Sequence, residues 1–179
     1  MKRIYSTETV GNVDKTVLLK GWVHTRRDMG KLAFIDFRDR KGILQVVLVP
    51  DELDEASRAA MKDLRPEFCV EIEGIVQKRG AKQVNKNLET GEVELLAKRL
   101  VILNEAKTPP FELEDTKGVN EELRMKYRYL DIRSPRMLRN LELRDEVIQF
   151  FREFLHKEGF LEVETPLLTK GTPEGAREY

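Results

Sequence analysis

Residues 17–49 read VLLKGWVHTRRDMGKLAFIDFRDRKGILQVVLV, and the apolar runs in this segment predict three β-strands. The predicted strands are Val17–His24, Ala33–Asp39 and Ile43–Val49. Arg26–Lys31, which contains Gly30, is predicted to turn the first strand into the second, and Arg40–Gly42 is a short hairpin connection that ends in glycine. The segment therefore predicts three consecutive strands joined by short turns.

Two further strands and one helix follow in the sequence. The strands are predicted at Phe68–Lys78 and Val93–Leu103. Between the third and fourth strands, Glu52–Leu64 carries apolar residues at helical spacing, and Pro66 ends the pattern. One helix between the third and fourth of five short strands is the order of an oligonucleotide/oligosaccharide-binding (OB) barrel, which binds oligonucleotides on an exposed strand face and its flanking loops. The order alone leaves other small barrels open.

The chain changes character after the fifth strand. Residues 1–103 are predicted to form the barrel, and residues 104–135, with two consecutive prolines and no sustained apolar period, a hinge. Residues 136–179 begin a different domain, with a helix that ends near Gly159. Its apolar face comprises Leu143, Val147, Phe151, Phe154 and Leu155. Leu161–Thr165 alternates like a strand and ends at Pro166, and in these residues its only partner would be a second copy of the chain.

Composition narrows the class of protein. The 179 residues carry 32 Lys+Arg and 32 Asp+Glu, so the net charge is zero, and charged residues make up 36%. No stretch approaches the roughly 20 apolar residues that cross a bilayer, and the single cysteine, Cys69, fits a reducing compartment. His24 and His156 lack the spacing of metal ligands, and no phosphate loop, HExxH or nucleophile elbow is present. These features predict a cytoplasmic, metal-free binding protein without membrane contact or a catalytic centre of its own.

Charge is distributed unevenly along the chain. Lys20–Lys41 holds seven basic and three acidic residues, and Gln77–Asn87 holds four basic residues and no acid. Between them, Asp51–Glu73 holds eight acidic and three basic residues. Two basic segments separated by an acidic one suggest a face that binds a polyanion, with an ordinary solvated surface as the alternative.

Phe34 is the most informative single residue of the barrel segment. Alternate residues of a strand share a face, so Phe34 lies on the polar face with Asp36 and Arg38. An aromatic ring on such a face, flanked by Arg26 and Arg27, suits the stacking of single-stranded bases. The alternative is a ring covered by a loop.

Two other side chains of the predicted strands have polar groups that need a hydrogen-bond partner. Gln45 lies in an apolar run, where its carboxamide could read a base edge or simply sit at a strand edge. Trp22 is predicted to lie in the core, with its indole N–H bonded to a carbonyl.

Several long motifs, in order, resemble the bacterial aspartyl-tRNA synthetases, which are class II aminoacyl-tRNA synthetases. They are GWVHTRRD (21–28), FIDFRD (34–39), GILQVV (42–47), LRMKYRYLD (123–131), EGFLEVETP (158–166) and TPEGAR (172–177). The resemblance implies a five-stranded OB-fold anticodon-binding domain, a hinge, and the helix-plus-strand start of a class II α+β catalytic domain, which is motif 1.

The resemblance also implies roles for individual residues. Phe34 matches the aromatic that stacks on the central anticodon base, a uridine, and Gln45 the residue that bonds its edge. Arg27 falls among contacts to the first base, and Arg79 and Asn85 near those to the third. Met29 matches a position that helps to separate tRNA-Asp from tRNA-Asn, although it is neither diagnostic residue, so the second tRNA stays open. Gln77 departs from an arginine common in the family.

For the whole protein the resemblance implies an aspartate–tRNA ligase that uses ATP and Mg²⁺ and dimerises through motif 1. Pro166 matches the dimer interface, and Glu174 matches a mobile loop that approaches the ammonium group of aspartate. Motifs 2 and 3 do not lie in these 179 residues, so the chain is expected to be an amino-terminal part, cofactor-free and not catalytic alone. The alternatives are a stand-alone OB module that binds nucleic acid and a structural dimerisation piece.

Overall fold

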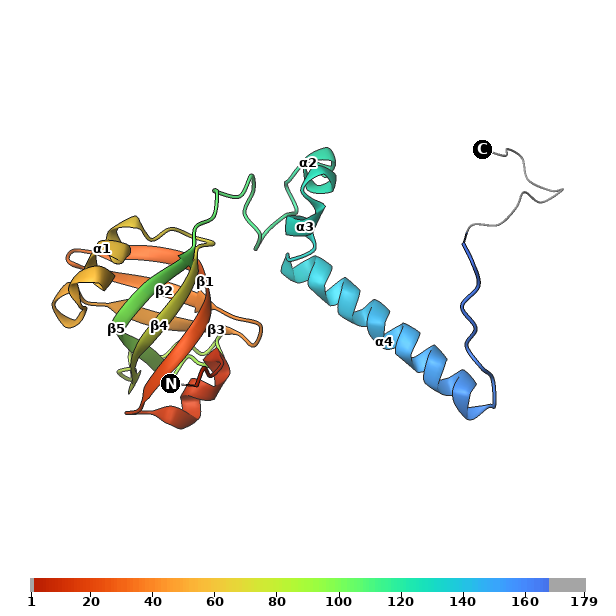
Figure 1. Cartoon of the computed structure of the whole chain (residues 1–179), viewed down its shortest axis with the longest axis horizontal. Coiled ribbons are helices and arrows are strands. Elements are labelled where there is room, and N and C mark those ends of the chain that lie inside the picture. The colour runs from red at the N-terminus through yellow and green to blue at the C-terminus, as the bar shows by residue number, and fades with distance from the viewer. Residues whose placement is uncertain (1, 168–179) are drawn as a thin grey trace. The chain divides into compact units, whose positions relative to one another are not determined.

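The computed structural model describes residues 2–167, and the chain forms two compact units, Met1–Thr108 and Pro109–Tyr179 (Figure 1). The predicted Glu174 lies outside the described residues. No helix within residues 2–167 is long and apolar enough to cross a membrane.

The first unit is a closed five-stranded barrel (Figure 1). Its strands are β1 (Thr16–Met29), β2 (Leu32–Arg38), β3 (Ile43–Leu48), β4 (Cys69–Lys78) and β5 (Val93–Asn104). They close in the order β1-β2-β3-β5-β4, antiparallel except for β3 and β5. The helix α1 (Glu55–Asp63) connects β3 to β4, preceded by the short 3₁₀ helix η2 (Pro50–Glu52). The predicted OB barrel with one helix between its third and fourth strands is confirmed.

The barrel core follows from strict alternation along the strands. In β2, Ala33, Ile35 and Phe37 are fully buried, whereas Phe34 and Asp36 point outward and stay partly exposed. Gly21 makes room for the Phe37 ring, because a Cβ at Gly21 would lie 2.6 Å from that ring and 2.3 Å from a backbone oxygen. Burying a Phe side chain contributes about 1.5–3 kcal/mol, so these inward residues hold the barrel closed.

Strand β1 is longer than predicted. The expected turn at Arg26–Lys31 is wrong, because Thr25–Met29 continues the ladder with β2 and only Gly30 and Lys31 form the turn. Gly30 has a φ of +63°, which suits glycine at this tight reversal. Charged side chains do not end a strand when its backbone groups still find partners. The β1 ladder is interrupted only by a bulge between Val23 and Thr25.

Trp22 is also placed differently from the prediction. It is 43% exposed, because the inward positions on either side are taken by the buried Gly21 and Val23. Trp22 pairs with Arg38 of β2 and Cys69 of β4 in the register, so its side chain shares their outer face.

The amino terminus adds a 3₁₀ helix, η1 (Ser6–Asn12), that the sequence pattern did not indicate. It is tied to the β2–β3 hairpin by Asp39, whose carboxylate accepts hydrogen bonds from the backbone and hydroxyl of Ser6 at 2.6 and 2.8 Å. The same carboxylate accepts from the backbone N–H groups of Lys41 and Gly42. One buried acid thus closes the hairpin and fixes the terminal segment.

The second unit is helical in its described part. It contains α2 (Glu121–Lys126), α3 (Arg128–Asp131) and α4 (Pro135–Lys157). As predicted, α4 stops just before Gly159, which has a φ of +86°. The N–H groups of Gly159 and Phe160 donate to the carbonyls of His156 and Leu155 and close the helix end. Within the described residues Leu161–Thr165 pairs with no other strand, so its pairing with a second copy of the chain stays a prediction.

Candidate nucleic-acid interface

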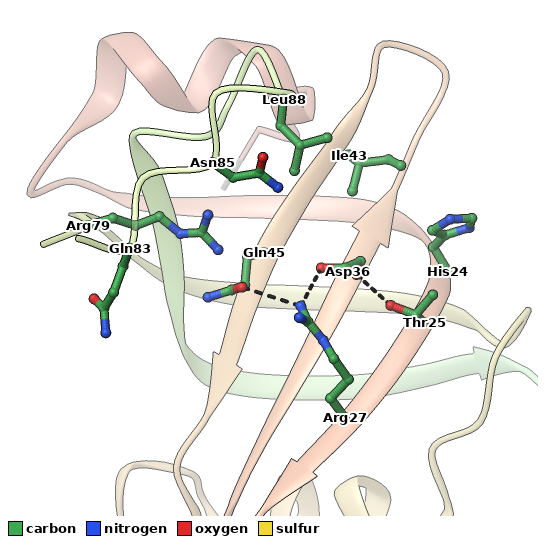
Figure 2. Close-up of a pocket in the computed structure, with 10 residues that line it drawn as sticks. All are labelled: His24, Thr25, Arg27, Asp36, Ile43, Gln45, Arg79, Gln83, Asn85 and Leu88. Carbon is green, nitrogen blue, oxygen red and sulfur yellow. Dashed lines mark hydrogen bonds and ion pairs between the residues drawn. The ribbon is translucent and has the colours of Figure 1, made fainter. Parts of the chain in front are cut away.

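Two adjacent hollows lie on the outer face of the barrel, between β1–β3 and the loop that follows β4. The first has a volume of about 380 Å³ and includes Arg27, Gln45, Arg79 and Asn85 in its lining (Figure 2). The second has a volume of about 420 Å³ and is lined in part by Arg27, Phe34, Gln45, Arg79 and the exposed Met29. The structure therefore brings together the six barrel residues to which the resemblance assigns a part in tRNA recognition.

The strand register explains this convergence. Phe34 of β2 lies directly opposite Arg27 of β1 and Val47 of β3. Two residues further along, Asp36 lies opposite Thr25 and Gln45. Because directly opposite residues of neighbouring strands share a face, an aromatic ring, a guanidinium and a carboxamide gather on one outward surface.

A polar network joins the first three strands across the floor of the first hollow. Thr25 Oγ1 donates to Asp36 Oδ2, and Arg27 Nη2 donates to Asp36 Oδ1 at 3.1 Å. The same Arg27 nitrogen reaches Gln45 Oε1 at 3.4 Å (Figure 2). Arg27 is thus held between an acid and an amide oxygen.

The network continues onto β5 and the end of β4. Gln45 Nε2 donates to Glu94 Oε2 at 2.9 Å, and Arg79 Nε lies 3.4 Å from the same oxygen. Arg79 follows directly after β4; its side chain is only 5% exposed, and its Nη1 donates to the carbonyl of Gly91 at 3.5 Å. Side chains from β1, β2, β3 and β5, and one that directly follows β4, therefore form one connected set of polar contacts.

The loop between β4 and β5 supplies Asn85. Its backbone N–H donates to the Gly91 carbonyl at 3.1 Å, and its side-chain oxygen accepts from the N–H of Asn87. A Cβ at Gly91 would lie 1.8 Å from the Asn85 carbonyl oxygen, so only glycine allows the loop to fold back here. This close approach sets Asn85, itself exposed, at the rim of the first hollow.

Arg26 does not belong to this face, although the sequence suggested it as a cation beside Phe34. Its guanidinium donates to the carbonyls of Met61 and Leu64 at 2.9 and 2.7 Å and pairs with Asp28. Those carbonyls lie at the end of α1, where a cation is favourable. Adjacent residues of a strand point to opposite faces, which separates Arg26 from Arg27.

Three members of the network, Thr25, Asp36 and Glu94, were not identified as site residues from the sequence. Asp36 could have been found, because it alternates with Phe34 on one strand face. Glu94 gave no signal, because it is 49 residues from its partner Gln45.

The remaining predicted features lie elsewhere. Pro166 is exposed, in the second unit. Within residues 2–167 no three His, Cys, Asp or Glu side chains gather closely enough to hold a metal ion.

Comparisons with known proteins define the class. Residues 17–103 match the family model of an OB-fold nucleic acid binding domain, and residues 120–179 match that of the class II tRNA synthetases (D, K and N). A solved structure, asparaginyl-tRNA synthetase from Pyrococcus horikoshii complexed with asparaginyl-adenylate, matches with a TM-score of 0.79 and 29% identity, over 98% of this chain and 39% of that chain. The chain therefore combines an OB-fold nucleic acid binding domain with part of a class II tRNA synthetase domain.

Curated relatives narrow the class further. The chain is 54% identical over 167 residues, 93% of its length, to an aspartate–tRNA(Asp/Asn) ligase of Geobacillus sp. (strain WCH70). It is 55% identical over 163 residues, 91% of its length, to an aspartate–tRNA ligase of Lysinibacillus sphaericus (strain C3-41). The chain belongs to the aspartyl-tRNA synthetase family, and it spans 28% and 27% of the length of these two relatives.

Proposed function

We propose that the barrel recognises the anticodon of tRNA-Asp as part of an aspartate–tRNA ligase. The observation that carries the proposal is the partly exposed ring of Phe34, which shares a hollow with the guanidinium of Arg27 and the carboxamide of Gln45. Aromatic faces stack on bases, guanidinium groups attract phosphates, and carboxamides match base edges. A hollow that combines the three suits a single-stranded loop.

Each residue has a distinct part in this proposal. Phe34 stacks on the central uridine, and Gln45 pairs with the edge of that base. Arg27 contacts the first anticodon base, whereas Arg79 and Asn85 at the first hollow contact the third. Since Arg79 is held by Glu94 and Gly91, it would bind with little loss of side-chain freedom.

Discrimination between two tRNAs is part of the same proposal. Met29 is exposed at the edge of the Phe34 hollow, where a neighbouring base could touch it. The names of the relatives include both tRNA(Asp/Asn) and tRNA(Asp) ligases, so tRNA-Asn is the second substrate to test.

The complete ligase would form an aspartyl-adenylate from ATP and aspartate in the cytoplasm and transfer aspartate to tRNA-Asp. The complete ligase would use ATP and Mg²⁺, and we propose no residue of this chain as a ligand of either. Glu174 would approach the ammonium group of aspartate. Exposed apolar residues of α4, including Val147 and Phe151, support a dimer interface that also takes in Pro166.

The test is fluorescence anisotropy with anticodon stem-loops at one fixed salt concentration. One stem-loop carries the tRNA-Asp anticodon, and the control differs only in the central uridine. Tighter binding of the uridine stem-loop is expected. Equal affinity for both stem-loops would contradict anticodon reading and leave a surface that follows phosphates alone, with a steep loss of affinity as salt rises.

A further inference from the structure

Gln45 lies between two groups of opposite hydrogen-bonding character. On one side the guanidinium of Arg27 can only donate, and on the other Glu94 Oε2 accepts from the amide nitrogen. The carboxamide oxygen faces Arg27 Nη2 at 3.4 Å, and the amide nitrogen faces Glu94 Oε2 at 2.9 Å. A flipped carboxamide would set donor against donor and acceptor against acceptor, so the two neighbours fix its orientation.

Arg27 can fix the orientation of Gln45 only if its own side chain is fixed in place. The Arg27 side chain is 57% exposed and would otherwise sample many rotamers. Asp36, only 22% exposed, accepts from Arg27 Nη2 through Oδ1 and from Thr25 Oγ1 through Oδ2. The carboxylate is therefore anchored on β1 by one oxygen while the other oxygen holds the guanidinium beside Gln45.

Orientation matters because the two pyrimidines differ in the order of their edge groups. Uridine presents the N3–H donor beside the O4 acceptor, whereas cytidine presents the N3 acceptor beside the N4 amino donor. Gln45 has one acceptor position and one N–H left after its contacts with Arg27 and Glu94. For a base fixed in place by stacking on Phe34, one carboxamide orientation matches uridine and the flipped one matches cytidine.

We infer that Asp36 is a positioning residue that fixes Gln45 through Arg27 and so determines the preference for uridine over cytidine at the central position. The inference rests on the proposed anticodon-binding function. A carboxylate on a surface that binds phosphates weakens binding by charge repulsion. Asp36 nevertheless lies in the lining of the first hollow, which is explained if it contributes to selectivity between bases rather than to affinity.

The experiment compares Asp36→Asn with Asp28→Asn in this chain. Both variants remove one negative charge, but Asp28 pairs with Arg26, away from the hollows. Binding is measured by anisotropy with stem-loops that carry uridine or cytidine at the central position. For Asp36→Asn the ratio of the two affinities is expected to fall by about tenfold, within the range for one base-edge pair, while Asp28→Asn keeps the ratio of the unmodified chain. A general charge effect would raise both affinities alike in both variants.

Thr25 provides an independent second variant. Thr25→Val removes the hydroxyl that anchors Asp36 and is expected to lower the uridine preference, whereas Thr25→Ser keeps a hydroxyl and is expected to restore it. Thermal melting of each variant verifies folding. If Asp36→Asn does not fold, the uridine preference of Thr25→Val tests the inference in its place. A uridine preference that survives in both folded variants would overturn the role of Asp36 and leave anticodon reading intact. No preference in the unmodified chain would overturn both.

Discussion

The barrel and helix α4 contain apolar residues in similar abundance but place them differently. The barrel buries Leu19, Phe37 and Val46 completely, whereas α4 buries none of its described residues and leaves Phe151 58% exposed. Polar groups follow the same division. Asp39 in the barrel accepts four hydrogen bonds, while Ser134 Oγ, buried at the start of α4, makes none within the described part of the chain. The barrel satisfies its own groups, and α4 presents a surface that another element must cover.

The largest expected effect separates the two regions by core truncation. Phe37→Ala should lower the free energy of unfolding of the barrel by about 3–5 kcal/mol, because the ring is fully buried against Gly21. The matched change in α4, Phe151→Ala, should alter the free energy of unfolding by no more than about 0.5 kcal/mol, since its ring is exposed.

Urea denaturation followed by Trp22 fluorescence measures the barrel transition, because Trp22 is the only tryptophan and lies on β1. Circular dichroism follows the helices in parallel. Comparable losses for both variants would mean that α4 is as well packed as the barrel, which would remove the contrast.

A second pair of variants tests the polar groups. Asp39→Asn should cost about 1.5–3 kcal/mol, because the carboxylate accepts charge-assisted bonds from Ser6 and from the hairpin backbone. Ser134→Ala should cost almost nothing, although Ser is a favoured residue at a helix start, because its hydroxyl caps no backbone group here. Thermal melting gives both values, and a loss of about 1 kcal/mol for Ser134→Ala would show that its hydroxyl has a partner after all.

The third effect contrasts two neighbouring rings of one strand. Phe34→Ala should weaken binding of the tRNA-Asp anticodon stem-loop by about 1–3 kcal/mol through loss of stacking. It should leave the barrel folded, unlike Phe37→Ala, because Phe34 points outward. Anisotropy titrations beside thermal melts distinguish the two results. Unchanged affinity in a folded Phe34→Ala variant would remove Phe34 from the interface.

Strand β2 also shows which features of the structure could be predicted from the sequence. Alternation alone separated Phe34 from Phe37, and the spacing of apolar runs gave the barrel, because both depend on local periodicity. Trp22 was misplaced because hydrophobicity outweighed position: Gly21 and Val23 take the inward sites. The bond between Gln45 and Glu94 could not be foreseen, since it depends on the barrel register that places β3 beside β5.

The smallest expected effect concerns the stability of the barrel in acid, which depends on contacts that Glu71 makes with the neighbouring strands. Hydrogen bonding to Lys20, followed by Arg99, holds the pKa of Glu71 below its ordinary value of 4.5. These partners lie on β1 and β5, so the contacts exist only in the closed barrel. Because the folded pKa is lowered, the stabilisation is complete above pH 4.5 and is lost as the pH falls through the folded value.

Glu71→Gln should therefore flatten the dependence of barrel stability on pH below 4.5 and lower stability at pH 7 by no more than about 1 kcal/mol, since both cations are partly solvated. The matched control, Glu92→Gln, removes the same charge at an exposed position outside this group. Urea midpoints between pH 3 and pH 7, followed by Trp22 fluorescence, give the comparison. If Glu92→Gln flattened the curve as much as Glu71→Gln, net charge rather than the bridge across three strands would account for the acid sensitivity.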